Sequence, residues 1–135
     1  MFYFFVNLVL HTVVSGALLW LLLRFVRMNK NRKNKKGFTF LLPVLCVLIF
    51  SFHAFTNTLP KLGDVPAVIQ SAYQPARQGV VEEVGLFNNT LRIDGEVYFY
   101  NPFEYKPAVG DYLLVTATRY SHYIAHFSVV ADRAQ

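Results

Sequence analysis

The side chains best suited to proton or metal chemistry are two histidines inside long apolar runs. His11 stands four residues after Asn7 and four before Ser15, so a helix would place all three on one face. His53 lies in the second run. Counted from the basic stretch between the runs, the two histidines differ in depth by only about 3 Å, at ~1.5 Å per helical residue. We expect the two imidazoles to meet across a helical hairpin.

This histidine pair allows two interpretations. Ionisable residues inside a membrane are often functional, which suggests a proton or metal sensor or a transport element. The alternative is a hydrogen bond between helices that fixes their packing. Two histidines alone make a poor metal site, and no acidic residue precedes Asp64. The structural interpretation is therefore favoured, and the sequence predicts no metal and no cofactor.

The second half of the sequence holds several residues of catalytic type, without the spacing that catalysis needs. His122 and His126 would lie about 13 Å apart on a strand. Glu82 and Glu83 are adjacent, so they would point to opposite faces of a strand. Ser121 precedes a histidine but has no orienting acid nearby in sequence. The sequence therefore predicts a protein that is not an enzyme.

Aromatic residues around a proline-bounded loop are the candidate binding surface. If Val97 and Phe99 point inward, alternation points Tyr98 and Tyr100 outward. Exposed tyrosines favour contact with a protein partner. The alternative is a rim that meets lipid headgroups, where tyrosine is enriched. The candidate residues are Tyr98, Tyr100, Phe103, Tyr105, Tyr120 and Tyr123.

The elements that carry the histidines are two predicted transmembrane helices. Residues 2–23 and 38–58 carry no formal charge, and about 20 such residues span a bilayer. The basic residues follow the first run instead of preceding it, so we expect a retained span and not a cleaved signal peptide. The predicted spans are about 2–26 and 38–58. Thr39 is expected to cap the second helix, with Pro43 in or just after its first turn.

The stretch RMNKNRKNKK, residues 27–36, predicts the orientation of the chain. Lys and Arg are enriched in cytoplasmic loops. We expect loop 27–37 in the cytoplasm and both termini outside, in a plasma or inner membrane. The net charge of +5 comes from this stretch, because residues 59–135 are mildly acidic. Binding to nucleic acid is therefore not expected, although the pI is about 9.5.

Residues 59–77 read as an amphipathic juxtamembrane segment. Asp64 is a predicted N-cap, with Pro66 in the first turn of a short helix that Pro75 ends. Its apolar stripe includes Val68 and Ile69. The stripe fits the headgroup layer and the face of a following domain equally well.

Residues 78–131 are predicted to form five short antiparallel strands. Val, Ile, Tyr, Phe and Thr dominate the runs, and Asn, Asp, Gly and Pro separate them. At Asp94-Gly95 we expect a three-residue loop pairing Arg92 with Glu96, because that register separates charged from apolar side chains. The predicted fold class is a membrane α-hairpin, with two transmembrane helices, followed by a small all-β barrel-like domain of SH3-like or OB type.

The ending PAVGDYLLVTATRYSHYIAHFSVV is similar to the ends of small membrane-anchored β-barrel domains, such as the OB-type tail of NfeD-like proteins. The similarity covers about 40 residues and rests on turn and strand chemistry. It implies an OB-type domain and carries over no functional residue.

These patterns favour a non-catalytic accessory membrane protein whose extracytoplasmic β-domain docks on a protein partner, in an assembly or immunity-type role. Its partners would be the lipid bilayer and a protein partner or a second copy. A domain this small, without disulfides, is near the lower size limit for independent stability. We expect support from the juxtamembrane helix, a partner or self-association. The alternative function is a membrane sensor or transport-associated subunit that uses His11 and His53.

Overall fold

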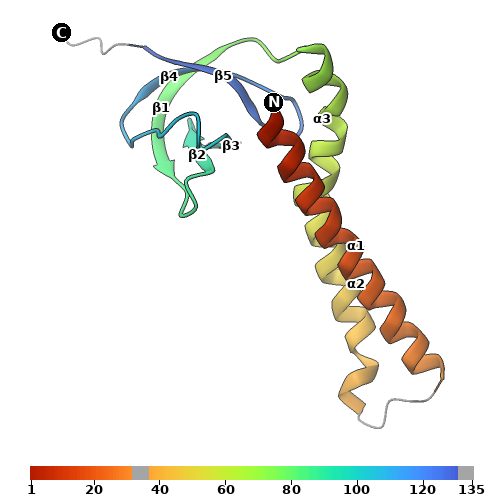
Figure 1. Ribbon diagram of the computed structural model, residues 1–135. Coiled ribbons are helices and arrows are strands. Elements are labelled where there is room, and N and C mark those ends of the chain that lie inside the picture. Colours follow the sequence, from red (N-terminus) through yellow and green to blue (C-terminus); the bar gives the residue numbers. More distant parts are fainter. Residues whose placement is uncertain (32–36, 131–135) are drawn as a thin grey trace. The chain divides into compact units, whose positions relative to one another are not determined.

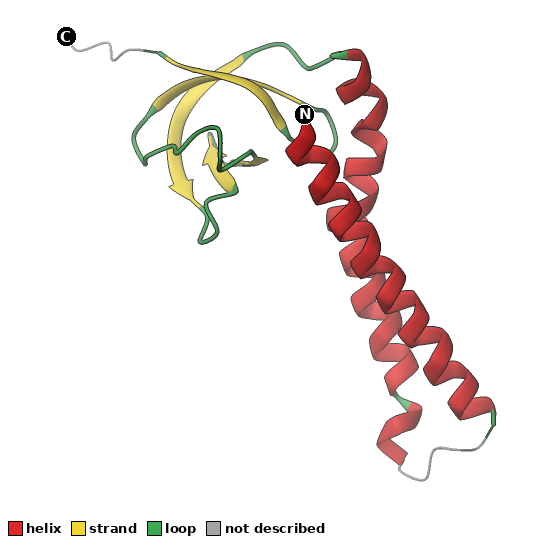
Figure 2. Ribbon diagram, viewed as in Figure 1, coloured by secondary structure: helices red, strands yellow, loops and turns green. Residues whose placement is uncertain are grey.

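The computed structural model describes residues 1–31 and 37–130, which form two units. The hairpin unit comprises Phe5–Leu62. The β unit comprises Met1–Phe4 together with Gly63–Gln135. Figure 2 shows the first as helices and the second as mainly strands and loops. Residues 32–36 of the predicted loop 27–37 and the last residue of the predicted domain 78–131 lie outside the described residues.

The hairpin unit confirms two helical runs that are long and apolar enough to cross a membrane. They cover Phe2–Lys30 and Gly37–Gln70, and together they suggest a membrane protein. The first run is a single helix, and the second combines 3₁₀, α-helical and π-helical segments. The elements are α1 Phe2–Lys30, the 3₁₀ turn η1 Gly37–Phe40, α2 Leu42–His53, the π-helical segment η2 Ala54–Thr58 and α3 Leu59–Gln70, with the three α-helices labelled in Figure 1.

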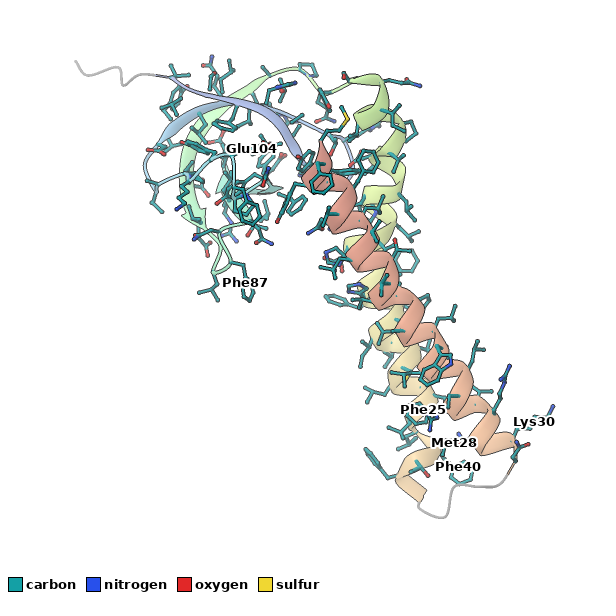
Figure 3. The ribbon with its side chains drawn as sticks, in the orientation of Figure 1. Phe25, Met28, Lys30, Phe40, Phe87 and Glu104 are labelled. Carbon is teal, nitrogen blue, oxygen red and sulfur yellow. The ribbon has the colours of Figure 1, made fainter. Side chains whose placement is uncertain are left out.

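The start of α2 differs from the prediction. Its N-cap is Leu41, which makes no side-chain capping bond, while Thr39 lies in the preceding 3₁₀ turn. The predicted Thr39 cap is therefore wrong. Pro43 stands in the first turn, as expected, where its missing N–H costs little. Figure 3 labels Phe40 and Met28 near this end of the hairpin, where the Asn29 side chain donates to the Phe40 carbonyl at 3.3 Å.

The π-helical segment has a local cause. Pro60 has no N–H, and in a regular α-helix its ring would clash with the carbonyl of Thr56. One wider turn avoids that clash, and the Leu59 N–H donates to the Ala54 carbonyl five residues back. The Thr56 hydroxyl donates to the Phe52 carbonyl at 2.7 Å, a second local bond that competes with the helix ladder. The segment follows directly after His53, and such wide turns are frequent at functional sites.

The juxtamembrane segment continues the second helical run and does not start a new helix. Asp64 lies inside α3, so its predicted N-cap role is wrong. The helix ends at Gln70, and Ser71 has a left-handed φ of 54°. The apolar stripe is only half buried: Val68 is 0% exposed, whereas Ile69 is 63% exposed.

The β unit contains one five-stranded antiparallel sheet that is not closed into a barrel. Its strand order is β3-β2-β1-β4-β5. One isolated parallel bridge joins Phe99 at the end of β3 to Tyr123, next to the start of β5. The buried core includes Val81, Leu91 and Leu113. The strands are β1 Arg77–Val84, β2 Thr90–Ile93, β3 Glu96–Phe99, β4 Tyr112–Ala117 and β5 Ile124–Val129.

The β2–β3 turn contradicts the predicted register. Ile93 pairs with Glu96, so the loop has two residues and not three. Asp94 and Gly95 have φ values of 50° and 76°, and two positive φ values are typical of a tight type I′ hairpin turn. The exposed Glu96 carboxylate accepts from Arg77 at 2.8 Å, so this charge pairs without entering the core.

The predicted support from the juxtamembrane helix is present within the β unit. Asp64 is 1% exposed, and its carboxylate accepts hydrogen bonds from the backbone N–H groups of Tyr120 and Ser121 and from the Ser121 hydroxyl. Phe4 is 0% exposed, and its ring centroid lies 5.1 Å from that of Tyr123. Residues on both sides of the hairpin unit in sequence therefore complete the core of the β unit.

Candidate functional sites

The predicted meeting of His11 and His53 is confirmed. Their ring centroids lie 5.2 Å apart with an interplanar angle of 37°. His11 Nδ1 and His53 Nε2 are buried, as is Asn7 Oδ1 one helical turn before His11. Among the described residues, none of these three atoms has a hydrogen-bond partner. Neutral imidazole has one donor and one acceptor nitrogen, so the pair has spare capacity for a proton, a polar ligand or a metal ion.

A hydrogen bond between side chains of the two helical runs lies one turn away from the imidazoles. Ser15 Oγ and Thr58 Oγ1 are 2.9 Å apart, and the Thr58 hydroxyl also reaches the His11 carbonyl at 3.5 Å. Lys61, 7% exposed, follows in α3. Two hydroxyl groups therefore make a hydrogen bond between the helical runs beside the His11–His53 ring contact. His11 Nδ1 and His53 Nε2 take no part in these hydrogen bonds.

The predicted aromatic surface is divided by the structure. Tyr98, Tyr100 and Tyr123 are only 5%, 3% and 3% exposed, so the prediction that Tyr98 and Tyr100 point outward is wrong. Phe103 and Tyr120 are exposed. The reason is the two-residue turn, which pairs Leu91 with Tyr98 on the inner face and leaves Val97 outside.

Electrostatics mark the inward tyrosines as neutral structural groups. Burial raises the pKa of Tyr123 to about 12. Burial, together with a 2.9 Å hydrogen bond to Asp111, raises the pKa of Tyr105 to about 12. The Tyr98 hydroxyl donates to Glu96 at 2.9 Å, and this bond and Arg77 lower the pKa of the Glu96 carboxyl. These groups hold fixed protonation states near neutral pH and position loops.

The β1–β2 loop carries an exposed apolar pair that sequence reasoning missed. Leu86 is 100% exposed and Phe87 is 85% exposed, and Figure 3 shows Phe87 projecting from the tip of this loop. The turn is well defined: Gly85 N–H donates to the Thr90 carbonyl, and Asn88 N–H donates to the Gly85 carbonyl, each at 2.9 Å. In the sequence, Leu and Phe continue a strand-like run up to the turn pair Asn88-Asn89, so the sequence predicts them at the end of the strand and not in the loop.

A hollow of about 200 Å³ lies among residues of β1, β2, β3 and the start of the β1–β2 loop. Gly85 contributes to its lining, so the hollow adjoins the loop that carries Leu86 and Phe87. Its walls include Thr90, Leu91 and Val97, the last 52% exposed. Glu83 and Arg92 also line it and lie 3.4 Å apart as an exposed ion pair. We call Leu86, Phe87 and this hollow together the loop–hollow surface, which combines an exposed apolar pair with a neighbouring ion pair.

Comparison of the chain with protein-family models, with curated proteins and with solved structures finds no match.

Proposed function

We propose that this chain is a non-catalytic, membrane-anchored accessory protein whose β unit docks on a protein partner through the loop–hollow surface. The observation that carries the proposal is the exposure of Leu86 and Phe87 on a hydrogen-bonded turn. Two adjacent large apolar side chains in water are unfavourable in an isolated protein, and their fixed presentation lowers the entropy cost of binding.

The composition of the loop–hollow surface supports a protein partner over lipid. Protein interfaces place apolar anchors at the centre and polar groups at the rim. Leu86 and Phe87 supply the anchors, and the Glu83–Arg92 ion pair supplies a charged neighbour. A partner of matching chemistry has an apolar pocket flanked by charges of both signs.

Of the two predicted barrel types, SH3-like and OB-type, the sheet order supports the OB type. The bridge between Phe99 and Tyr123 is parallel and joins the end of β3 to the segment before β5. Extending that bridge would close the order β1-β2-β3-β5-β4 into a ring. In OB-type domains the face of strands 2 and 3 and the loop between strands 1 and 2 bind ligands. The same elements carry the hollow and the exposed pair in this chain.

We place both ends of the chain outside and loop 27–37 in the cytoplasm of a plasma or inner membrane, because the basic residues cluster in that loop. Under this topology the β unit meets partners on the outer side. Reporter fusions at residue 135 test the orientation: an active phosphatase and a dark fluorescent protein are expected. A bright fluorescent fusion with a silent phosphatase contradicts it.

The docking proposal is tested by co-purification from mild detergent. The full-length tagged chain is compared with the double variant Leu86→Ser/Phe87→Ser and with the control Val109→Ser, whose side chain is 66% exposed in another loop. We expect wild type and the control to retain the same bound protein, and the double variant to lose at least 90% of it. Equal capture by all three chains, or capture by none, contradicts the proposal.

A second function is favoured by the geometry of the histidine pair: a membrane sensor or transport-associated subunit using His11 and His53. The support is the 5.2 Å ring contact with two buried, unpartnered nitrogens. Replacing both residues by Leu should abolish a pH- or metal-dependent phenotype, with Val9→Leu as the control for a change in the same helix. An unchanged phenotype in the double variant excludes this function.

A further inference from the structure

We infer that the loop between β3 and β4 binds the lipid surface through Phe103, which contacts Tyr3 in the first turn of α1. The ligand is the boundary between headgroups and acyl chains in the leaflet at which α1 begins. This contact is separate from the loop–hollow surface and needs no protein partner.

The first support is the position of Tyr3. It lies in the first turn of α1, and its ring centroid is 6.1 Å from that of Phe103 in an edge-to-face contact. A hydrocarbon core needs about 20 helical residues, and the 20 residues before Arg24, the first charge in the chain, begin at Phe4. Tyr3 therefore falls at the edge of the hydrocarbon core, and Phe103 is held beside it.

A second ring contact within the β unit fixes this position. Tyr3 also stacks on Phe99, with centroids 5.5 Å apart and an interplanar angle of 28°. Phe99 is 9% exposed at the end of β3, so Tyr3 rests on a residue of the folded sheet. The start of α1 and the loop after β3 are therefore held together by rings on both sides of Tyr3.

The second support is the exposure of the rings at this edge. Phe103 is 88% exposed and Phe2 is 83% exposed. Asn101 presents Phe103 in a defined turn: its side-chain oxygen accepts from the Phe103 N–H at 3.1 Å, and its carbonyl accepts from the Glu104 N–H at 3.2 Å. Aromatic rings favour the membrane interface, and a ring already fixed there loses little entropy on insertion.

Lipid is the occupant because of continuity with the transmembrane helix. Phe103 contacts Tyr3 of α1. When α1 spans the bilayer, the immediate surroundings of Phe103 are therefore water and lipid headgroups. Leu86 and Phe87 have a charged hollow beside them instead, which is unfavourable in lipid. The two exposed apolar surfaces of the β unit thus have different ligands.

The test uses the single tryptophan of the chain, Trp20, which is replaced by Phe to give a silent background. Phe103→Trp is introduced there, and the full chain is placed in nanodiscs with acyl-brominated or ordinary phosphatidylcholine. Val109→Trp, near the far end of the same loop and adjoining β1 through Gly110, is the matched control. Hydrogen exchange of the strands verifies that both variants fold.

We expect Trp at position 103 to emit at shorter wavelength than Trp at position 109. Brominated lipid should quench position 103 by at least half, with little effect on position 109. Iodide should quench the two in the opposite order. Equal iodide quenching of both positions without lipid quenching overturns the inference. Shielding of position 103 from both quenchers also overturns it, because that result indicates burial within the chain or against a second copy of it. Because no partner protein is present, the result is independent of the docking proposal.

Discussion

The buried Asp64 carboxylate of the β unit and the buried imidazole nitrogens of the hairpin unit are in opposite hydrogen-bonding states. In the β unit, the Asp64 carboxylate receives four hydrogen-bond contacts from Tyr120 and Ser121, the shortest 2.6 Å. In the hairpin unit, His11 Nδ1, His53 Nε2 and Asn7 Oδ1 are buried without a partner among the described residues. A satisfied buried group stabilises a single structure, whereas an unsatisfied one costs free energy and offers binding capacity.

This difference indicates distinct roles for Asp64 and for the histidine pair. The polar contacts of Asp64 join α3 to the turn between β4 and β5, so they serve the fold of the β unit. The histidine pair makes a ring contact between the helical runs but no hydrogen bond through His11 Nδ1 or His53 Nε2 among the described residues. Substitution of Asp64 should therefore destabilise the β unit more than substitution of the histidine pair destabilises the hairpin unit.

The largest effect is expected at the border between the units. Phe4→Ala should lower the free energy of unfolding of the β unit by about 4 kcal/mol, because a fully buried ring is lost from contact with Tyr123. Leu8→Ala, one helical turn further along α1 and in the hairpin unit, is the matched control. Hydrogen exchange of the full chain in detergent should show faster exchange in the strands only for Phe4→Ala. Equal effects of both variants contradict the assignment of Phe4 to the β unit.

Asp64→Ala should come next, lowering the free energy of unfolding of the β unit by about 3 kcal/mol. The change leaves the Tyr120 and Ser121 N–H groups without their charged acceptor. Chemical denaturation followed by exchange in β4 and β5 measures it, and Glu104→Ala at an exposed position is the control. A loss below about 0.5 kcal/mol would refute the structural role of Asp64.

The histidine pair should behave differently. Replacing His11 and His53 together by Leu should change the stability of the full chain by less than about 1 kcal/mol, because removing unsatisfied polar groups offsets the altered packing. Thermal unfolding monitored by helical circular dichroism checks this. A collapse of helical structure in the double variant would show that the pair is structural after all.

The smallest effect is a pH dependence at the alkaline end. Tyr105 has a folded-state pKa of about 12, above its ordinary value of 10, so the folded state favours the neutral hydroxyl. This contribution is complete below pH 10 and is lost as pH rises through 12.

Tyr105→Phe removes this titration and the hydrogen bond to Asp111. The variant should therefore lose stability less steeply than wild type in that window. Denaturation of the full chain at a series of pH values measures the slopes, and equal slopes contradict the predicted contribution of Tyr105.

Sequence reasoning was most successful where one-dimensional signals decide the structure. Charge-free runs and the basic stretch predicted both long helices, and the depth count brought His11 to His53. The strand positions also followed from composition and turn residues. These features depend on the hydrophobicity and the local conformational preference of each segment, and both can be read from its residues without knowledge of tertiary contacts.

Faces and capping were harder, because tertiary contacts overrule the local pattern. The register at Asp94-Gly95 was set by turn geometry and by Arg77, which pairs with Glu96 from another strand. A bulge between Val81 and Glu83 further shifts the pairing of β1 with β2. Asp64 resembles an N-cap in sequence, yet the backbone N–H groups that donate to its carboxylate belong to Tyr120 and Ser121, 56 and 57 residues away. No local pattern contains these partners.

The exposed pair was missed for a related reason. In the sequence, Leu86 and Phe87 extend the apolar run of β1 up to the turn pair Asn88-Asn89, whereas in the structure β1 ends at Val84 and both residues belong to the turn. Exposure of large apolar residues is a three-dimensional property that periodicity alone does not reveal.

The central claim, docking of a protein partner through the loop–hollow surface, is tested most directly by site-specific photocrosslinking in the membrane. A photoreactive phenylalanine derivative at Phe87 is compared with the same group at Val109, both in the full chain in its native cells. The account predicts one discrete crosslinked protein at position 87 and none at position 109. Crosslinks to lipid alone at position 87, or the same products at both positions, would contradict it.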